Sequence, residues 1–579
     1  MEQRPSLEIE SPKGRQWVHV HAESQQRPLT DLLRHADFPL NMRCGGRGIC
    51  DGCIIELVTG SLTHIPTGQT IIAYDTPLPI RSCQHRLNPG APASLRLPAR
   101  SLVAYQPLVV TDFSINIPYA HSPLYHPPQI NPAFRPVGAA IDIGTTTVVV
   151  LLLDLTDGRI LAKSAAFNQQ IHLGDDVVTR ITLCSQNRHG LRQLQDAVAN
   201  RTIAPLLADA MNQAAVSPDQ IVCITIAGNT TMLHIAAGVD PSSMGVAPFT
   251  PTFVNHRILS PADIFLPATH PPDAPDSSFI VHRSSFPCSP SAAIHLLPSA
   301  AAYIGADLTA GIVATGLLYD QGPSLLVDAG TNGEIILKHA DRLFACATAA
   351  GPAFEGAGLS CGIRAGDGAI SYITLTKDPL SVQTEVIGQK KDLRPAGLCG
   401  SAYIDFLAQA RRLGLITPTG RFIRDAIPDS SGLLLPWGKN NTDLAFRIAN
   451  ADGNAKRPIV VSAVDIAHLL QAKAAIAAGI LILLNQVGLH PSQIKRLYLA
   501  GGFGTHLNPQ HAIDCGMLPG FRPDQILPVG NTALAGAYIA MLDSSIITEL
   551  ARIGRHMHVV ELNLDPNFEA TYIDQLCLP

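Results

Sequence analysis

The chain has 579 residues, of which 46% are hydrophobic and 15% are charged, and its formal net charge is −5. This length predicts several domains, and the composition supplies enough apolar side chains to bury large cores. A charge this small gives no indication of nucleic acid or an anionic membrane as a partner. The N-terminus is polar and lacks the apolar core of a signal peptide, so we expect a cytoplasmic protein.

Three regions of different composition follow one another along the chain. Residues 1–100 hold four cysteines with the spacing of a metal site. Residues 101–136 are rich in proline, which predicts an extended, semi-stiff linker. From residue 137 onward, β-branched runs alternate with helical patterns rich in Ala and Leu, which is typical of α/β folds. The sequence therefore predicts a multidomain α/β protein.

The four cysteines have the pattern Cys-x5-Cys-x2-Cys-x29-Cys. Two irons bridged by two sulfides need four thiolates, and three cysteines on one tight loop with a distant fourth meet that need. Glycines between them let the backbone fold closely around a cluster. The alternatives are a redox disulfide and zinc, although structural zinc sites usually show two paired Cys-x2-Cys knuckles. We predict a [2Fe–2S] cluster whose ligands are Cys44, Cys50, Cys53 and Cys83.

This segment resembles plant-type [2Fe–2S] ferredoxins, which implies a β-grasp domain over residues 1–100. The first two cysteines are separated by five residues rather than four, a spacing that adrenodoxin-like ferredoxins share. The other eight of the twelve cysteines are scattered singly, and we interpret them as buried structural thiols.

Two strings in the third region have the same form, namely an apolar strand, then Asp-x-Gly-Thr, then a second β-rich strand. They read AIDIGTTTVVV and LLVDAGTNGEIIL. Such hairpins can wrap phosphates with backbone amides, and two of them can clamp a triphosphate from both sides. We predict that Asp142 holds Mg²⁺ through its water shell and that Asp328 orients the attacking water. The predicted phosphate contacts are Gly144, Thr145 and Thr146 in the first hairpin, and Gly330, Thr331 and Asn332 in the second.

A third string, LYLAGGFGTHLNP, ends an apolar strand in Gly501 and Gly502. Glycines at such a strand end let the backbone pass close to a flat adenosine. Together the three strings resemble the motifs of the actin, sugar kinase and Hsp70 superfamily. This resemblance implies a duplicated RNase H-like ATPase with halves at 137–320 and 321–579. A proline-rich stretch at 240–298 is expected to be an insertion outside the sheet of the first half.

Three further strings reveal no chemistry by their spacing. AGNTTMLHIAAG predicts a helix capped at Asn229 or Thr230. A glycine-rich loop holds Glu355 and Arg364. The apolar stretch 474–489 follows a lysine and is too short to span a bilayer comfortably, so it predicts a buried helix.

A ferredoxin segment followed by a duplicated ATPase, with GPAFEGAGLSCGIRA and LAGGFG, resembles the ATP-dependent reductive activators of corrinoid enzymes over essentially the whole chain. The resemblance implies that one electron passes from the cluster to an inactive cobalt(II) corrinoid protein, restoring cobalt(I) for methyl transfer with consumption of Mg-ATP. Some members carry further clusters in a C-terminal module, but only Cys577 follows Cys515 here. The electron donor is then another protein, a ferredoxin or a flavoprotein. Relatives also imply a homodimer.

Other interpretations stay open at this point. A kinase would use the same ATP scaffold but would leave the four cysteines without a role. Activators of radical dehydratases, which include those of 2-hydroxyacyl-CoA dehydratases, are also ATP-driven reductants, but they are shorter and hold a [4Fe–4S] cluster between two subunits. A redox sensor whose closure on ATP gates partner binding is the third alternative.

Overall fold

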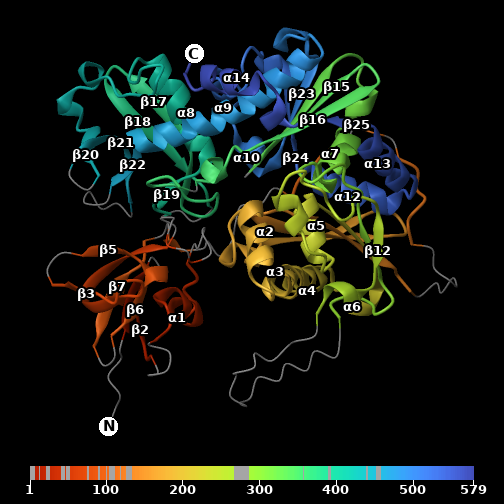
Figure 1. Ribbon diagram of the computed structural model, residues 1–579, viewed down its shortest axis with the longest axis horizontal. Coiled ribbons are helices and arrows are strands. Elements are labelled where there is room, and N and C mark those ends of the chain that lie inside the picture. The colour runs from red at the N-terminus through yellow and green to blue at the C-terminus, as the bar shows by residue number, and fades with distance from the viewer. Residues whose placement is uncertain are drawn as a thin grey trace. The chain divides into compact units, whose positions relative to one another are not determined.

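The described residues fall into two compact units. The first comprises Met1–Leu108, Ile171–Thr179 and Pro352–Leu470, and the second comprises Val109–Gln170, Arg180–Gly351 and Gln471–Pro579 (Figure 1). The computed structural model describes residues 7–579 except 12–13, 21–25, 41–45, 47, 49–52, 75–76, 89–90, 99–100, 103–110, 116, 118, 126–133, 267–285, 331, 357, 389–392, 439–440 and 452–457.

A mixed sheet forms the N-terminal part of the first unit. Its strand order is β2-β1-β7-β3-β4, with β5 and β6 also paired to β3, and β1 and β7 run parallel at its centre. Leu7 and Ile9 of β1 share one core with Leu29 and Leu33 of helix α1. Among the described residues of this domain, one α-helix packs on a mixed sheet, which is consistent with the β-grasp domain expected from the sequence. The elements are β1 Leu7–Ser11, β2 Gly14–Val18, α1 Leu29–His35, β3 Ile54–His64, β4 Thr70–Ala73, β5 Leu78–Arg81, β6 His85–Leu87 and β7 Ala93–Arg96.

The rest of the first unit contains two small sheets and a helix. The sheets have the orders β18-β17-β19 and β20-β21-β22, and α8 is buried over its first eleven residues. The elements are β17 Ala369–Lys377, β18 Leu380–Val386, β19 Gly397–Leu398, α8 Gly400–Arg412, β20 Leu434–Trp437, β21 Asp443–Asn450 and β22 Pro458–Ser462.

Two six-stranded sheets in the second unit share one topology. Their orders are β10-β9-β8-β11-β13-β12 and β16-β15-β14-β23-β24, the latter with β25 beside β16. In each, the first strand pairs antiparallel with the second and parallel with the fourth. When the edge strands β12 and β25 are left out and the other strands are numbered within each half, both sheets have the order 3-2-1-4-5. The repeated order confirms the predicted duplicated ATPase fold.

The strands of these sheets form where the sequence has continuous apolar runs. In β9 the run TVVVLLLD is buried at every residue after the first, as expected for a β-branched strand covered on both faces. The strands are β8 Val137–Ile143, β9 Thr147–Asp154, β10 Ile160–Phe167, β11 Ile221–Gly228, β12 Arg257–Leu259, β13 Ala293–Leu296, β14 Ser324–Ala329, β15 Gly333–His339, β16 Arg342–Thr348, β23 Arg496–Ala500, β24 Ile526–Gly530 and β25 Met557–Val559.

Helices α7 and α12 cross at small residues and thereby fix the ends of both sheets. A Cβ atom on Gly536 would lie 2.4 Å from the Cβ of Ala310, and one on Gly311 would lie 2.8 Å from Oγ1 of Thr532. The labelled helices lie side by side in Figure 1. The remaining helices are α2 Val177–Gln186, α3 Gly190–Val198, α4 Ala204–Ala214, α5 Thr230–Ala236, α6 Pro261–Ile264, α7 Ala306–Thr315, α9 Ala463–Gln486, α10 Gly501–His506, α11 Pro509–Asp514, α12 Thr532–Leu542, α13 Ser545–His556 and α14 Phe568–Asp574.

The expectation that residues 240–298 lie outside the first sheet was wrong for two short segments. β13 runs parallel to β11, and β12 pairs with β13, so this stretch supplies the fifth strand of the sheet and an edge strand. The apolar run AIHL that forms β13 is only four residues long and lies among prolines and serines. Its strand signal was therefore too short to stand out from the surrounding composition.

The expected linker at 101–136 is only partly a linker. The described residues of Thr111–Leu124, which we call the strap, pack along α12 within the second unit. Phe113 forms a β-bridge with Gly530, and Ser122 forms one with Asp543. The proline content predicted an extended backbone but not that this backbone would find hydrogen-bonding partners on a helix far away in sequence.

The predicted apolar helix at 474–489 begins earlier, as part of α9. Within the described part of the chain, α9 alone is long and apolar enough to cross a membrane, but 78% of its most apolar window is buried inside the protein. This is the pattern of a core helix.

Candidate functional site

The first phosphate hairpin is a tight turn that follows β8. Asp142 is the penultimate residue of the strand, and the Gly144 amide donates to the Thr147 carbonyl at 2.9 Å. A Cβ atom on Gly144 would lie 2.7 Å from that same oxygen. Only glycine therefore permits the turn to close this tightly, which explains the small residue after Asp142 in the motif.

Buried polar side chains hold the carbonyls of this turn from one side. Nδ2 of Asn168 donates to the Gly144 carbonyl at 2.9 Å, and Nη2 of the fully buried Arg180 donates to the Thr145 carbonyl at 2.6 Å. A trans peptide directs its C=O and N–H in opposite directions. The amides of Thr145 and Thr146 therefore point away from Asn168 and Arg180, as amides that receive a phosphate would.

The second hairpin joins β14 to β15 in the same way. The Gly330 amide donates to the Asn332 carbonyl at 3.0 Å, and Asp328 lies opposite Glu334 in the antiparallel pair. Thr331, predicted as a phosphate contact, lies outside the described residues.

The glycine pair at the end of β23 lies beside this second hairpin. Gly501 has φ +89°, and a Cβ atom there would lie 2.5 Å from Oδ1 of Asp328. Around a Cβ atom on Gly502, in contrast, there is open space. The predicted adenosine motif and the predicted catalytic aspartate therefore meet at one end of the sheet.

Four carboxylates lie at the two hairpins and affect one another's pKa values, and each stays partly accessible to solvent. They belong to Asp142, Asp307, Asp328 and Glu334. Burial raises the pKa of Asp142 to about 7 despite a hydrogen bond from Asn531, and the charge of Asp328 adds to the increase. Burial raises the pKa of Asp328 to about 6. Burial and the charges of Asp328 and Asp142 raise the pKa of Asp307 to about 7. The pKa of Glu334 lies well above its usual value, because of burial and of Asp307 and Asp328. Such a cluster favours a cation.

No three acidic, histidine or cysteine side chains among the described residues are close enough together to hold a metal ion by themselves. Mg²⁺ dehydrates reluctantly, and proteins usually bind it by few carboxylates together with phosphates and water.

Three residues of the site were not predicted from the sequence: Asp307, Glu334 and Asn531. Asp307 lies in the first turn of α7, after an apolar strand. Asn531 caps α12 by accepting from the Leu534 amide at 2.8 Å, and its Nδ2 donates to Oδ2 of Asp142 at 2.8 Å. An Asn directly after a short strand is an N-cap signal. That signal would have located the helix, but not the contact with Asp142.

The cysteine site is described at two of its four predicted positions. Cys53 and Cys83 are both buried, and a hydrogen bond with the Cys83 thiol is the largest cause that lowers the pKa of Cys53 to about 6. The two thiols therefore meet, as two ligands of one cluster must. Cys44 and Cys50 lie outside the described residues.

The surroundings of this thiol pair also suit a cluster. Nε2 of Gln84 donates to the Gly46 carbonyl at 3.0 Å and lies 3.7 Å from the Cys83 sulfur. Gly48 has φ +75°, and a Cβ atom there would lie 2.7 Å from Cδ of Gln84. The left-handed backbone at Gly48 favours a glycine at this position. Donors near cluster sulfurs are a recognised influence on reduction potential.

The remaining cysteines mostly behave as structural thiols. Six of the eight are buried, whereas Cys184 is half-buried and Cys577 is exposed. Burial raises the pKa of Cys223 and of Cys288 to about 12, which leaves them protonated and unreactive.

Two of the strings without assigned chemistry have structural roles. Asn229 caps α5 by accepting from the Met232 amide at 2.9 Å, as predicted, and its Nδ2 donates to Oγ1 of Thr145 at 3.1 Å. In the first unit, Arg364 donates to Asp175 at 2.6 Å and lies 3.8 Å from Glu355. Asn229 therefore belongs to the first phosphate hairpin, whereas Arg364 forms a buried ion-pair network.

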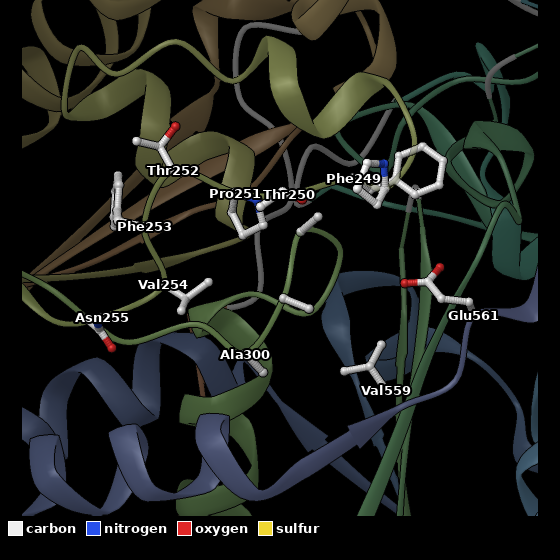
Figure 2. Close-up of a pocket in the computed structure, with 13 residues that line it drawn as sticks. Phe249, Thr250, Pro251, Thr252, Phe253, Val254, Asn255, Ala300, Val559 and Glu561 are labelled. Atoms are coloured by element: carbon white, nitrogen blue, oxygen red, sulfur yellow. The ribbon is translucent and has the colours of Figure 1, made fainter.

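A cavity of about 450 Å³ lies in the second unit. Its walls are residues 248–255 and 300–302 together with Val559 and Glu561, whose carboxylate points into the cavity in Figure 2. None of the four carboxylates and no residue of the phosphate hairpins lines it. The cavity is therefore not part of the nucleotide site.

Known proteins are similar to this chain along most of its length. Residues 322–579 match the family model of the C-terminal domain of RACo, the ASKHA domain, and residues 137–320 match that of the RACo middle region. The corrinoid activation enzyme RamQ of Eubacterium limosum is 28% identical over 95% of this chain and 96% of its own length. The [Co(II) methylated amine-specific corrinoid protein] reductase of Methanosarcina barkeri is also 28% identical, over 44% of this chain and 45% of its own length. The solved structure of a reductive activator for corrinoid, iron–sulfur protein covers 99% of this chain and 98% of its own, with 27% identity and a TM-score of 0.67.

Proposed function

The chain belongs to the RACo family of reductive activators of corrinoid proteins, and from this premise we propose that it uses ATP to drive an electron onto the cobalt of a corrinoid protein. The observation that carries the proposal is the pair of topologically equivalent Asp-x-Gly-Thr hairpins. Their carboxylates, Asp142 and Asp328, are close enough that the charge of Asp328 raises the pKa of Asp142. A second, separate site holds the thiol pair of Cys53 and Cys83. A redox centre and an ATPase on one chain are what an uphill electron transfer requires.

The nucleotide half of the reaction follows from the hairpins. The amides of Thr145 and Thr146, which point away from their buried supports, would receive one side of the triphosphate, and the hairpin at Gly330–Asn332 would receive the other. Mg²⁺ brought in with the nucleotide would lower the raised pKa of Asp142 and would be held by that carboxylate through water. Asp328 would orient the attacking water.

The redox half would be held by Cys44, Cys50, Cys53 and Cys83. When bound there, a [2Fe–2S] cluster supplies a one-electron carrier, and plant-type centres lie near about −400 mV. The chain's own contribution is to bury two of the thiolates and to place the Gln84 amide near the Cys83 sulfur. The electron donor would be a ferredoxin or a flavoprotein, and the cell compartment would be the cytoplasm.

The first prediction concerns Asp142. Replacing it in Asp142→Ala removes the carboxylate that would hold Mg²⁺, so the affinity for Mg-ATP should fall about tenfold, which corresponds to about 1.4 kcal/mol. Titration calorimetry with a slowly hydrolysed analogue and Mg²⁺ measures this directly. Asp157→Ala is the matched control, because Asp157 is an exposed turn residue at the far end of β9. Equal affinities of Asp142→Ala and wild type would contradict the assignment.

A further inference from the structure

The strap, Thr111–Leu124, is fixed at its first end to the strand and helix that carry Asn531. The Asp112 carbonyl accepts from the Asn531 amide at 3.1 Å, and Phe113 forms a β-bridge with Gly530. The Phe113 ring also lies 5.8 Å from that of Tyr538 on α12. Gly530 has φ +74°, and a Cβ atom there would lie 2.3 Å from the Asp112 carbonyl oxygen. The turn before α12 is therefore shaped to receive the strap.

Lys163 on β10 holds the same end of the strap from the sheet side. Its Nζ donates to Oδ1 of Asp112 at 2.9 Å and to the Thr111 carbonyl at 3.2 Å. The ammonium also lies 5.7 Å from the centre of the Phe113 ring, within reach of a cation–π interaction. This end of the strap is thus held on one side by the turn before α12 and on the other by Lys163 of β10.

The other end of the strap closes the C-terminus of α12. The Ser122 amide donates to the Leu542 carbonyl and the Leu124 amide to the Met541 carbonyl, each at 2.9 Å. The last carbonyls of a helix have no partner within the helix, so the strap supplies donors that α12 lacks. The Ala120 amide adds a bond to Oδ2 of Asp543 at 2.8 Å. The strap therefore clamps α12 at both ends.

Asn531 connects this clamp to the nucleotide site. Its amide N–H is held by the strap, its Oδ1 caps α12, and its Nδ2 donates to Asp142. A movement of the strap at Asp112 would thus move the group that orients the Asp142 carboxylate. Asn531 acts through Asp142 and is a positioning residue.

We propose that the strap is coupled to the nucleotide site: a strap held on α12 sets Asn531 and Asp142 for Mg-nucleotide, and bound nucleotide in turn orders the strap. The inference rests on the proposed function only in taking the Asp142 site as the nucleotide site. Coupling between two such elements is reciprocal, because each changes the affinity of the other by the same factor.

The test compares Phe113→Ala with Phe134→Ala in the full-length protein. Phe113→Ala removes the contacts with Tyr538 and Lys163, whereas Phe134 is an exposed phenylalanine outside the strap. The affinity for an ATP analogue with Mg²⁺, measured by titration calorimetry, should fall about tenfold in Phe113→Ala, within the usual range of coupling. It should be unchanged in Phe134→Ala. Iron content should equal that of wild type in both variants.

Hydrogen exchange measures the reciprocal effect without any substitution. Mg-nucleotide should slow the exchange of the Ala120, Ser122 and Leu124 amides at least fivefold in wild type. In Asn531→Asp, which keeps an N-cap acceptor but places an anion beside Asp142, nucleotide should bind about tenfold more weakly.

Wild-type affinity in Phe113→Ala, or strap exchange that ignores nucleotide, would overturn the coupling and leave the proposed function intact. A wild-type protein that binds no nucleotide at all would overturn both.

Discussion

Cys83→Ser protein purified without oxygen should contain far less iron and sulfide than wild type, which should hold about two of each per chain. The reason is that Cys83 is the distant fourth ligand, and the structure brings its thiol against that of Cys53. Reduction of wild type should give one S = 1/2 EPR signal, and this signal should be lost in the variant. Affinity for Mg-ATP should be retained, because the nucleotide site is built from residues of the second unit.

Cys577→Ser is the matched control, since Cys577 is exposed and lies outside both proposed sites. It should keep the iron content and the EPR signal of wild type. Two findings would refute the cluster assignment: stoichiometric zinc without iron in wild type, and an unchanged cluster in Cys83→Ser.

Asp328→Ala should lower ATP turnover by about a hundredfold or more while Mg-ATP binding changes little. A positioned proton acceptor typically contributes a factor of 10² to 10⁴, and a group that acts only in the transition state affects turnover rather than affinity. Asp328 lies beside Gly501 and directly opposite Glu334 on the neighbouring strand β15. A water that attacks the terminal phosphate would be held at this position. Phosphate release under saturating Mg-ATP, with the corrinoid partner present, gives the rate.

Asp341→Ala serves as the control for that variant, because Asp341 is exposed in the turn between β15 and β16. It should hydrolyse ATP at the wild-type rate. If Asp328→Ala does so as well, the water-orienting role belongs to another residue, and Glu334 becomes the first candidate.

Much of this fold could be predicted because the two halves repeat one local pattern. The strings around Asp142 and Asp328 each combine an apolar strand, a turn and a second strand, and local patterns of that kind determine which strands pair as neighbours. The identical strand order of both sheets follows from the duplication. The cysteine spacing likewise predicted that Cys53 and Cys83 meet, although they are far apart in sequence.

What could not be predicted depends on contacts between distant segments. Asp307 and Asn531 enter the site because α7 and α12 cross at Gly536 and Gly311, and no local motif records that crossing. The strap was interpreted as a free linker because backbone amides make most of its contacts, and backbone amides leave no side-chain pattern in a sequence.

The energetic role of ATP follows from the reduction potentials of the cluster and of the cobalt. A plant-type cluster near about −400 mV would have to reduce a cobalt(II)/cobalt(I) couple that lies lower, as the family resemblance implies. Each ~59 mV of deficit costs a factor of ten in the equilibrium, or about 1.4 kcal/mol for one electron. Nucleotide binding can offset such a deficit only if the bound state favours one redox state of the partner.

The most direct test of the account is the visible spectrum of the cobalt in a cognate corrinoid protein, recorded under strict anoxia with this protein and a chemical reductant. Cobalt(I) should appear only when Mg-ATP is present, and it should fail to appear with either Cys83→Ser or Asp328→Ala. Cobalt(I) that forms equally fast without nucleotide would contradict the claim that ATP drives the electron transfer.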